Sequence, residues 1–221
     1  MKVAELWRYP VKSMAGERLD QAAVTDRGIA GDRVVHVRLD GGLITSRTHH
    51  RLLGLHARLG EDGEPLVDGR PWTSSEAEAA VVDAVGPGAQ LVRYDGRERF
   101  DVLPLLIATD GAIAELGVDH RRLRPNIVIG GVEGLAERAW PGHRLQIGET
   151  IIEIAKLRSR CVMTTFDPDT LEQDVSVLRR IAQRFGGKMA LDCDVVQGGA
   201  IRVGDAVTLL DAPTHAAGGG R

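Results

Sequence analysis

Short runs of alternating apolar and polar residues fill most of the first ninety positions. Val3 to Tyr9 has the β-branched and aromatic content of a strand, and Pro10 ends its ladder pairing. Ala22 to Thr25 and Val34 to Leu39 are further strand candidates, and Asp40-Gly41-Gly42 is a typical hairpin turn. Strands this short and closely spaced indicate a sandwich or barrel rather than repeated strand–helix units.

Two longer segments have helical features instead. Ser74-Ser75-Glu76 predicts a capped start for a helix that runs to Val85. A second helix is predicted between Asp169 or Thr170, as its cap, and Gly186-Gly187, as its end. Its apolar residues fall at helical spacing, at positions 171, 175, 178, 182 and 185. We expect this second helix to pack across one face of a barrel.

The second half of the chain repeats one hairpin pattern. Residues 145–149 and 201–205 both read apolar-polar-apolar-Gly-acidic, which predicts two hairpins that help to close a barrel. The charged run from Asp95 to Asp101 is the candidate seam between halves. The pattern therefore predicts a mostly β fold with helices (α+β). We expect a β-rich amino-terminal domain over residues 1–95, a β-barrel domain over 96–211 and a frayed tail over 212–221.

Composition narrows the class of protein. The 221 residues are 43% hydrophobic and 27% charged, with a net charge of −3, and only 4% are aromatic. The chain lacks the basic excess of a typical nucleic-acid-binding protein and has few aromatic residues on which bases could stack, so nucleic acid is a disfavoured partner. No apolar run approaches the ~20 residues of a membrane span, and the amino terminus has no apolar signal core. Two cysteines form neither a disulfide framework nor zinc-ligand spacing, so we expect a cytoplasmic protein without a membrane partner.

Candidate chemistry centres on residues 159–168, Ser-Arg-Cys-Val-Met-Thr-Thr-Phe-Asp-Pro. Cys161 follows Arg158 and Arg160, and guanidinium charges favour the thiolate, which attacks electrophiles or binds a soft metal. The alternative is a small buried strand residue, which is the commoner state of a free cysteine. Cys193 alternates with apolar neighbours and is predicted to be buried in a strand. Asp167 is predicted to shape the turn that follows.

Four other segments carry groups suited to an anion. Lys12-Ser13 pairs a point charge with a hydroxyl, Arg33 follows a glycine-punctuated turn, and Arg47 ends a strand. Pro125 places Arg124 at the mouth of a strand and Asn126 just inside it, where a planar fork and an amide suit a phosphate or a heterocycle. The alternatives are that Arg33 pairs with neighbours of Asp32 on the surface, that Arg47 leads the following His-rich segment into solvent, and that Lys12-Ser13 is an ordinary surface pair. The adjacent His49-His50 pair diverges on a regular element, which disfavours metal binding.

Five motifs occur together and in order. They are Pro10-Val11-Lys12-Ser13, Gly31-Asp32-Arg33, Arg124-Pro125-Asn126-Ile127-Val128, residues 160–168 and residues 201–205. Together they resemble the MOSC-domain proteins that carry an amino-terminal MOSC β-barrel domain. This family includes the mitochondrial amidoxime-reducing components and the carboxyl-terminal domain of molybdenum cofactor sulfurase. The resemblance runs from about Val3 to Leu210, and it implies a MOSC-type β-barrel with a smaller β-rich domain packed on it.

The resemblance implies a molybdenum-pterin cofactor, and pyridoxal phosphate is not expected. In the reductases of this family a cysteine thiolate binds the metal, and Cys161 stands at that position. The other assignments follow by motif match. Lys12, Ser13 and Arg33 match the family positions that hold the anionic phosphate of the cofactor. Arg124 and Asn126 match the pterin-side contacts, and Ser159 and Arg160 flank the metal position.

Two residues are less distinctive matches: Arg47 as a further cofactor contact, and Asp110 as a candidate catalytic acid. A metal-bound water is the other candidate acid.

Three hypotheses follow for the function. The first is a reductase of N-hydroxylated or N-oxide-type compounds, supplied with electrons by a separate flavin or iron–sulfur protein. In this hypothesis Cys161 is a ligand and the cofactor supplies the redox chemistry. The second is a sulfurtransferase or sulfur carrier, in which Cys161 carries a persulfide. The third is a cofactor-binding or carrier module with no turnover of its own.

Overall fold

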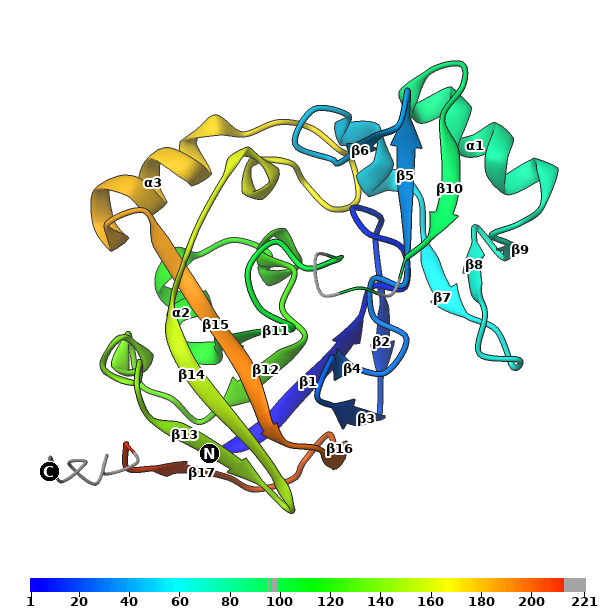
Figure 1. The fold of residues 1–221 in the computed structure, drawn as a ribbon. Coiled ribbons are helices and arrows are strands. Elements are labelled where there is room, and N and C mark those ends of the chain that lie inside the picture. The colour runs from blue at the N-terminus through cyan, green and yellow to red at the C-terminus, as the bar shows by residue number, and fades with distance from the viewer. Residues whose placement is uncertain (95, 97–98, 213–221) are drawn as a thin grey trace, which may run out of the picture.

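A computed structural model describes residues 1–94, 96 and 99–212. Its centre is a curled eight-stranded sheet with the order β17-β13-β14-β15-β11-β12-β1-β2 (Figure 1). β11 and β12 are parallel, and the other neighbours are antiparallel. The strands are β1 Lys2–Arg8, β2 Glu17–Leu19, β11 Leu105–Thr109, β12 Ile127–Gly130, β13 Arg144–Ile147, β14 Thr150–Ser159, β15 Lys188–Gln197 and β17 Val207–Leu210. The first twenty residues thus contribute two strands to a sheet otherwise built from the second half.

Three small sheets complete the fold, with the orders β10-β5-β6, β16-β3-β4 and β7-β8-β9. Their strands are β3 Gln21–Thr25, β4 Gly28–Ile29, β5 Val35–Leu39, β6 Gly42–Ile44, β7 Ala57–Leu59, β8 Pro65–Val67, β9 Arg70–Pro71, β10 Gln90–Arg93 and β16 Gly199–Arg202. β16 pairs with β3 across most of the sequence length. The mostly β fold with helices is confirmed, and strands from both halves of the chain share two of its sheets.

Two predictions about the second half need correction. The eight-stranded sheet is open: Lys2 and Ala206 form one isolated bridge, but no ladder closes a barrel within the described residues. The predicted hairpin over 201–205 is wrong, because β16 pairs with β3 whereas β17 pairs with β13. Gly204, at φ 95°, turns the chain, and the Val203 N–H donates to the Asp20 carbonyl. The Gly-acidic turn therefore passes the chain from one sheet to another.

The first predicted helix is confirmed and the second begins later than expected. In α1 (Ser75–Val85) the Ser74 hydroxyl caps the helix, and α2 (Asp110–Leu116) is capped by Thr109. The carboxylate of Asp174, rather than residue 169 or 170, caps α3 (Val175–Phe185). The Asp167 carboxylate accepts the N–H groups of residues 169 and 170, which holds a turn ahead of the helix. This agrees with the predicted turn role of Asp167.

Three apolar clusters stabilise the fold. One fills the inner face of the large sheet, a second lies under the amino-terminal strands, and a third joins α2 to α3. Cys193 is fully buried in β15, as predicted, and burial raises the pKa of its thiol well above the ordinary value. A buried thiol of this kind is chemically inert. Cys161 is therefore the cysteine that remains as a candidate for a metal ligand or a reactive thiol. The predicted seam and tail fall partly on residues 95, 97–98 and 213–221, which lie outside the described residues.

The start of α2 is pressed against the loop that follows β12. A Cβ at Gly111 would lie 2.3 Å from the Val132 carbonyl oxygen and 2.5 Å from that of Gly134. Backbone cannot move aside as a flexible side chain can, so Gly111→Ala should destabilise the protein by about 1–3 kcal/mol. Urea unfolding checks this. Gly42→Ala is the matched control, because a Cβ there would lie 3.4 Å from its nearest neighbour, the Leu39 carbonyl oxygen. Equal losses in both variants would contradict the prediction.

Candidate functional site

Five cation-bearing segments meet at one hollow beside the large sheet. β1 runs antiparallel to β12, and β11 runs parallel to β12, so the ends that follow β1 and precede β11 and β12 share one sheet edge. The hollow contains about 640 Å³ of empty space, part of it open to solvent, within the ~300–1,000 Å³ typical of small-molecule sites. Eight of the ten predicted site residues line it: Lys12, Ser13, Arg33, Arg47, Arg124, Ser159, Arg160 and Cys161.

Three of these residues have an unusual backbone. Ser13, Arg33 and Arg124 lie in the left-handed region, at φ 74°, 53° and 57°. This region costs a residue other than glycine on the order of 1–2 kcal/mol. Hydrogen bonds hold two of them: the Arg33 N–H donates to the Tyr9 carbonyl, and the Arg124 N–H ends the short 3₁₀ helix η3 (His120–Leu123). Strain of this kind is found preferentially at functional sites.

Asp101 draws three cations together inside the hollow. Its carboxylate accepts Lys12 Nζ at 2.7 Å, Arg47 at 2.9 Å and Arg158 at 3.3 Å. Burial would raise the pKa of Asp101, but these charges outweigh it and hold the pKa below the ordinary value. Burial lowers the pKa of Lys12, and Asp101 offsets part of that effect. Sequence reasoning assigned Asp101 to a seam, and no local pattern connects it to a lysine 89 positions away.

The charges in this hollow do not balance. Six cationic side chains line it: Lys12, Arg33, Arg47, Arg124, Arg158 and Arg160. Three carboxylates of the described residues pair with them: Asp101, Asp32 beside Arg33, and Asp192 beside Arg158. Three positive charges therefore remain, which favours an anionic ligand.

Arg124 and Arg160 carry much of this excess. The Arg124 guanidinium lies 4.3 Å from the centre of the Tyr9 ring and, among the described residues, its side chain forms neither a hydrogen bond nor an ion pair. Arg160 donates from Nη2 to the Leu123 carbonyl at 2.8 Å, while its Nε is buried without a hydrogen-bond partner in the described structure. Burial lowers the pKa of both guanidiniums to about 10, so both stay charged at neutral pH.

Cys161 lies where β14 ends and the short 3₁₀ helix η5 (Val162–Thr165) begins. It is a partly buried free thiol in extended backbone, and its carbonyl accepts the Thr164 N–H and hydroxyl, at 3.1 and 2.8 Å. Within the described residues no three His, Cys, Asp or Glu side chains gather as a metal site. The ring of His50 stacks on Phe166 at 4.7 Å. Among the described residues that line the hollow, Cys161 is the single thiol, which suits a metal that arrives with other ligands of its own.

Asn126 lies behind the hollow rather than at its surface. It is fully buried, and its Oδ1 accepts the Leu106 N–H at 3.1 Å while its Nδ2 donates to the Trp7 carbonyl at 3.3 Å. It therefore ties β1, β11 and β12 together at the edge where the cations meet. Its Oδ1 also lies 3.5 Å from Arg33 Nη1, so Asn126 reaches the site through Arg33.

Asp110 is not brought to the hollow. It begins α2, at the opposite end of β12 from Arg124, and its carboxylate accepts the N–H groups of Gly111, Gly131 and Val132 at 2.7 to 3.0 Å. Burial would raise its pKa, but these three donors outweigh that effect and hold the pKa below the ordinary value. The structure accounts for Asp110 as a support for the loop after β12.

Comparison with known families now defines the class of protein. The model of the MOSC N-terminal beta barrel domain matches residues 1–90, and the model of the MOSC domain matches residues 107–208. The two matches lie on either side of the boundary that we predicted near residue 95. The chain is a MOSC-domain protein with a MOSC N-terminal beta barrel domain, which confirms the resemblance found in its motifs.

Particular relatives are more distant. Mitochondrial amidoxime-reducing component 1 from Homo sapiens is 25% identical, over 94% of this chain and 82% of the relative. Molybdenum cofactor sulfurase from Bombyx mori is 34% identical, over 40% of this chain and 10% of the relative. The crystal structure of the YuaD protein from Bacillus subtilis superposes with a TM-score of 0.53 at 13% identity and covers 94% of both chains. This last likeness shows the fold.

The helices of the described residues are all too short or too polar to cross a membrane.

The structural role of Asp110 predicts a pH-dependent stability effect. Asp110→Ala should lower the free energy of unfolding at pH 7 by about 1–3 kcal/mol, because three backbone donors lose their acceptor. The folded-state pKa is depressed, so this stabilisation is present above the unfolded pKa of ~3.9 and is lost as pH falls through the folded pKa. Urea unfolding from pH 7 to pH 3 should show the parent and variant converging. A constant difference would contradict the ionic role.

Proposed function

We propose that this protein is a molybdenum-cofactor oxidoreductase that reduces N-hydroxylated or N-oxide-type compounds with electrons from a separate flavin or iron–sulfur protein. The observation that carries the proposal is the combination of one free, accessible thiol with three uncompensated positive charges in a single hollow. The likeness to the amidoxime-reducing components supports the reaction type. A cytoplasmic location stays a prediction.

The residues of the hollow fit a molybdenum-pterin group. A thiolate is a soft ligand, and it complements a metal that already carries sulfur donors. The buried Arg160 Nε and the Arg124 side chain have N–H donors that no described residue accepts, and a phosphate or pterin acceptor would satisfy them. Cys161 would hold the metal, and the cations from Lys12 to Arg160 would hold the anionic and heterocyclic parts.

When bound, the cofactor would supply the two-electron chemistry that removes oxygen from an N–O bond. The overall reaction consumes two electrons and two protons and releases water with the deoxygenated compound. The protein's own groups bind and orient. Asp101 keeps Lys12, Arg47 and Arg158 on one side of the hollow, and the buried Asp32 fixes Arg33 and the Tyr9 backbone on the other. This preorganised charge would hold an anion without further reorganisation.

A sulfur-carrying role for Cys161 is the second candidate. The likeness to molybdenum cofactor sulfurase favours it, because that match has the higher identity although it spans less of the chain. In this role the thiol itself would carry the transferred sulfur as a persulfide. The two roles differ in what should be found on the purified protein.

Metal analysis distinguishes them. Protein purified from a host that makes the cofactor should contain about one molybdenum per chain, in line with the single soft ligand at Cys161. Cys161→Ala should lose most of this metal, whereas Cys193→Ala, which removes the buried thiol, should keep it. Metal-free parent protein with a cyanide-labile sulfur on Cys161 would instead establish the carrier. Metal retained in full by Cys161→Ala would contradict the ligand assignment.

Cofactor retention also tests the anion site. Arg47→Ala removes one half-exposed cation that supports neither a strand nor a helix, so the fold should persist while the cofactor dissociates roughly threefold to tenfold faster. Arg51→Ala is the matched control, since Arg51 is a similarly exposed arginine that pairs with Asp83 away from the hollow. The loss of pterin fluorescence from the protein on gel filtration measures retention. Equal retention by both variants would place the anion elsewhere.

A further inference from the structure

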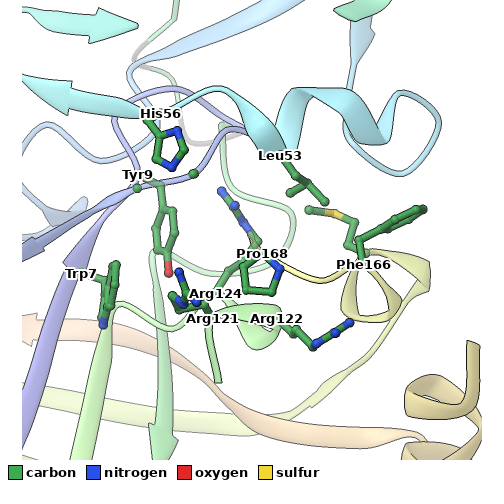
Figure 2. Close-up of a pocket in the computed structure, with 12 residues that line it drawn as sticks. Trp7, Tyr9, Leu53, His56, Arg121, Arg122, Arg124, Phe166 and Pro168 are labelled. Carbon is green, nitrogen blue, oxygen red and sulfur yellow. The ribbon is translucent and has the colours of Figure 1, made fainter. Parts of the chain in front are cut away.

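A second hollow lies next to the cofactor hollow and shares Arg124, but none of the other proposed cofactor contacts, with it. It contains about 560 Å³ of empty space, part of it open to solvent. Trp7 from β1 and Tyr9, which follows the end of β1, lie on one side of it and Phe166 on the other, with Leu53 above and Arg124 below in the view of Figure 2. Its walls are therefore largely aromatic and aliphatic.

The aromatic walls are fixed by contacts on their outer sides. The Trp7 indole N–H donates to Glu5 at 2.7 Å, and the Tyr9 hydroxyl donates to the Pro125 carbonyl at 3.1 Å. Burial raises the pKa of Tyr9 to about 12, so this hydroxyl stays protonated. Phe166 is held by the stacked ring of His50. These rings therefore present rigid apolar surface rather than free hydrogen-bonding groups.

Three arginines line the second hollow, and two of them are already neutralised. Arg121 pairs with Asp119 at 2.7 Å and with Asp169 at 2.6 Å, and Arg122 pairs with Asp167 at 2.9 Å. The Arg124 side chain has no carboxylate partner among the described residues. The hollow thus combines largely apolar walls with one guanidinium that packs over the Tyr9 ring and has no carboxylate partner in the described structure.

The two hollows touch each other. Arg124 and Met163 line both, and Met163 belongs to η5, which starts directly after Cys161. A guanidinium has five N–H donors, so one edge of Arg124 can serve the cofactor hollow while another serves the second hollow. A molecule in the second hollow would therefore lie beside the thiol that we assign to the metal.

We propose that the second hollow binds the flat aromatic part of a small organic substrate and that Arg124 selects a negatively charged or strongly accepting group on it. As a substrate site this rests on the proposed function; as a binding site for small aromatic acids it stands on the geometry of the hollow. The aromatic and aliphatic lining favours an apolar ring over a polar group of the same size. Charge selects anions over cations of the same size.

A charge series of matched probes tests the proposal. Benzoate, benzamide and benzylamine are titrated into the full chain, in cofactor-free and cofactor-loaded forms, and followed by the indole N–H signals in proton–nitrogen NMR spectra. Benzoate should shift the Trp7 signal saturably and leave those of Trp72 and Trp140, which line other parts of the fold. Benzamide should bind roughly tenfold more weakly, and benzylamine should not bind detectably. Trp7→Phe assigns the signal.

Variants separate the two hollows. Ala15 lines only the second hollow, so Ala15→Leu should weaken benzoate binding roughly tenfold by filling space. Arg124→Gln, measured on cofactor-free protein, should remove the preference for benzoate over benzamide. Arg47→Ala, in the cofactor hollow, should leave benzoate binding unchanged. Melting temperatures show whether each variant is folded.

The opposite results overturn the proposal. Binding that is lost in Arg47→Ala but kept in Ala15→Leu would place benzoate in the cofactor hollow, and equal affinity for benzoate and benzylamine would remove the role of Arg124. Absence of any Trp7 shift at millimolar benzoate would remove the site. The benzoate titration and the molybdenum content test separate claims, because the molybdenum content tests the proposed function. If the purified protein binds benzoate but contains no molybdenum, the hollow is a binding site for small aromatic acids and its assignment as a substrate site is overturned.

Discussion

Six cationic side chains in one hollow repel one another, and the rest of the site depends on how this repulsion is offset. Three carboxylates offset part of it, and each belongs to a different region of the fold. Asp32 is buried beneath Arg33, Asp192 lies on β15 beside Arg158, and Asp101 precedes β11 and bridges three cations. In a partly dry environment the remaining positive charge is costly unless an anion is bound. An anionic ligand would therefore stabilise the hollow by offsetting this charge.

Strand exchange between the two halves of the chain brings these charges together. β1 lies between β12 and β2 at one side of a sheet that the second half otherwise builds, so the loop after β1 reaches the segment before β12. Asn126 reinforces that edge through hydrogen bonds to two neighbouring strands. A loss of sheet pairing at this edge would separate Lys12 from Arg124 without altering either residue. The binding site and the fold thus depend on the same ladder.

One short element borders both hollows. η5 starts after Cys161, contributes Met163 to both hollows and leads to Phe166 in the second. The cofactor hollow has excess charge and a thiol, and the second hollow has aromatic surface. Arg124, which has no carboxylate partner among the described residues, lines both. A charged cofactor and a flat organic substrate would be kept on opposite sides of the same segment. Their reacting groups would meet at its amino-terminal end.

Local features were predictable from the sequence because they depend on neighbouring residues: the strand at Val3, the cap at Ser74, the buried Cys193 and the arginines beside Cys161. The motifs, taken in order, also identified the family. Contacts between distant segments were decided only by the tertiary structure. In the folded chain Asp101 contacts three cations, and Asn126 lies behind the hollow. Asp110 lies at the far end of β12. The pairing of β16 with β3 was also not predictable. A Gly-acidic turn specifies a change of direction but not the strand with which the next segment pairs.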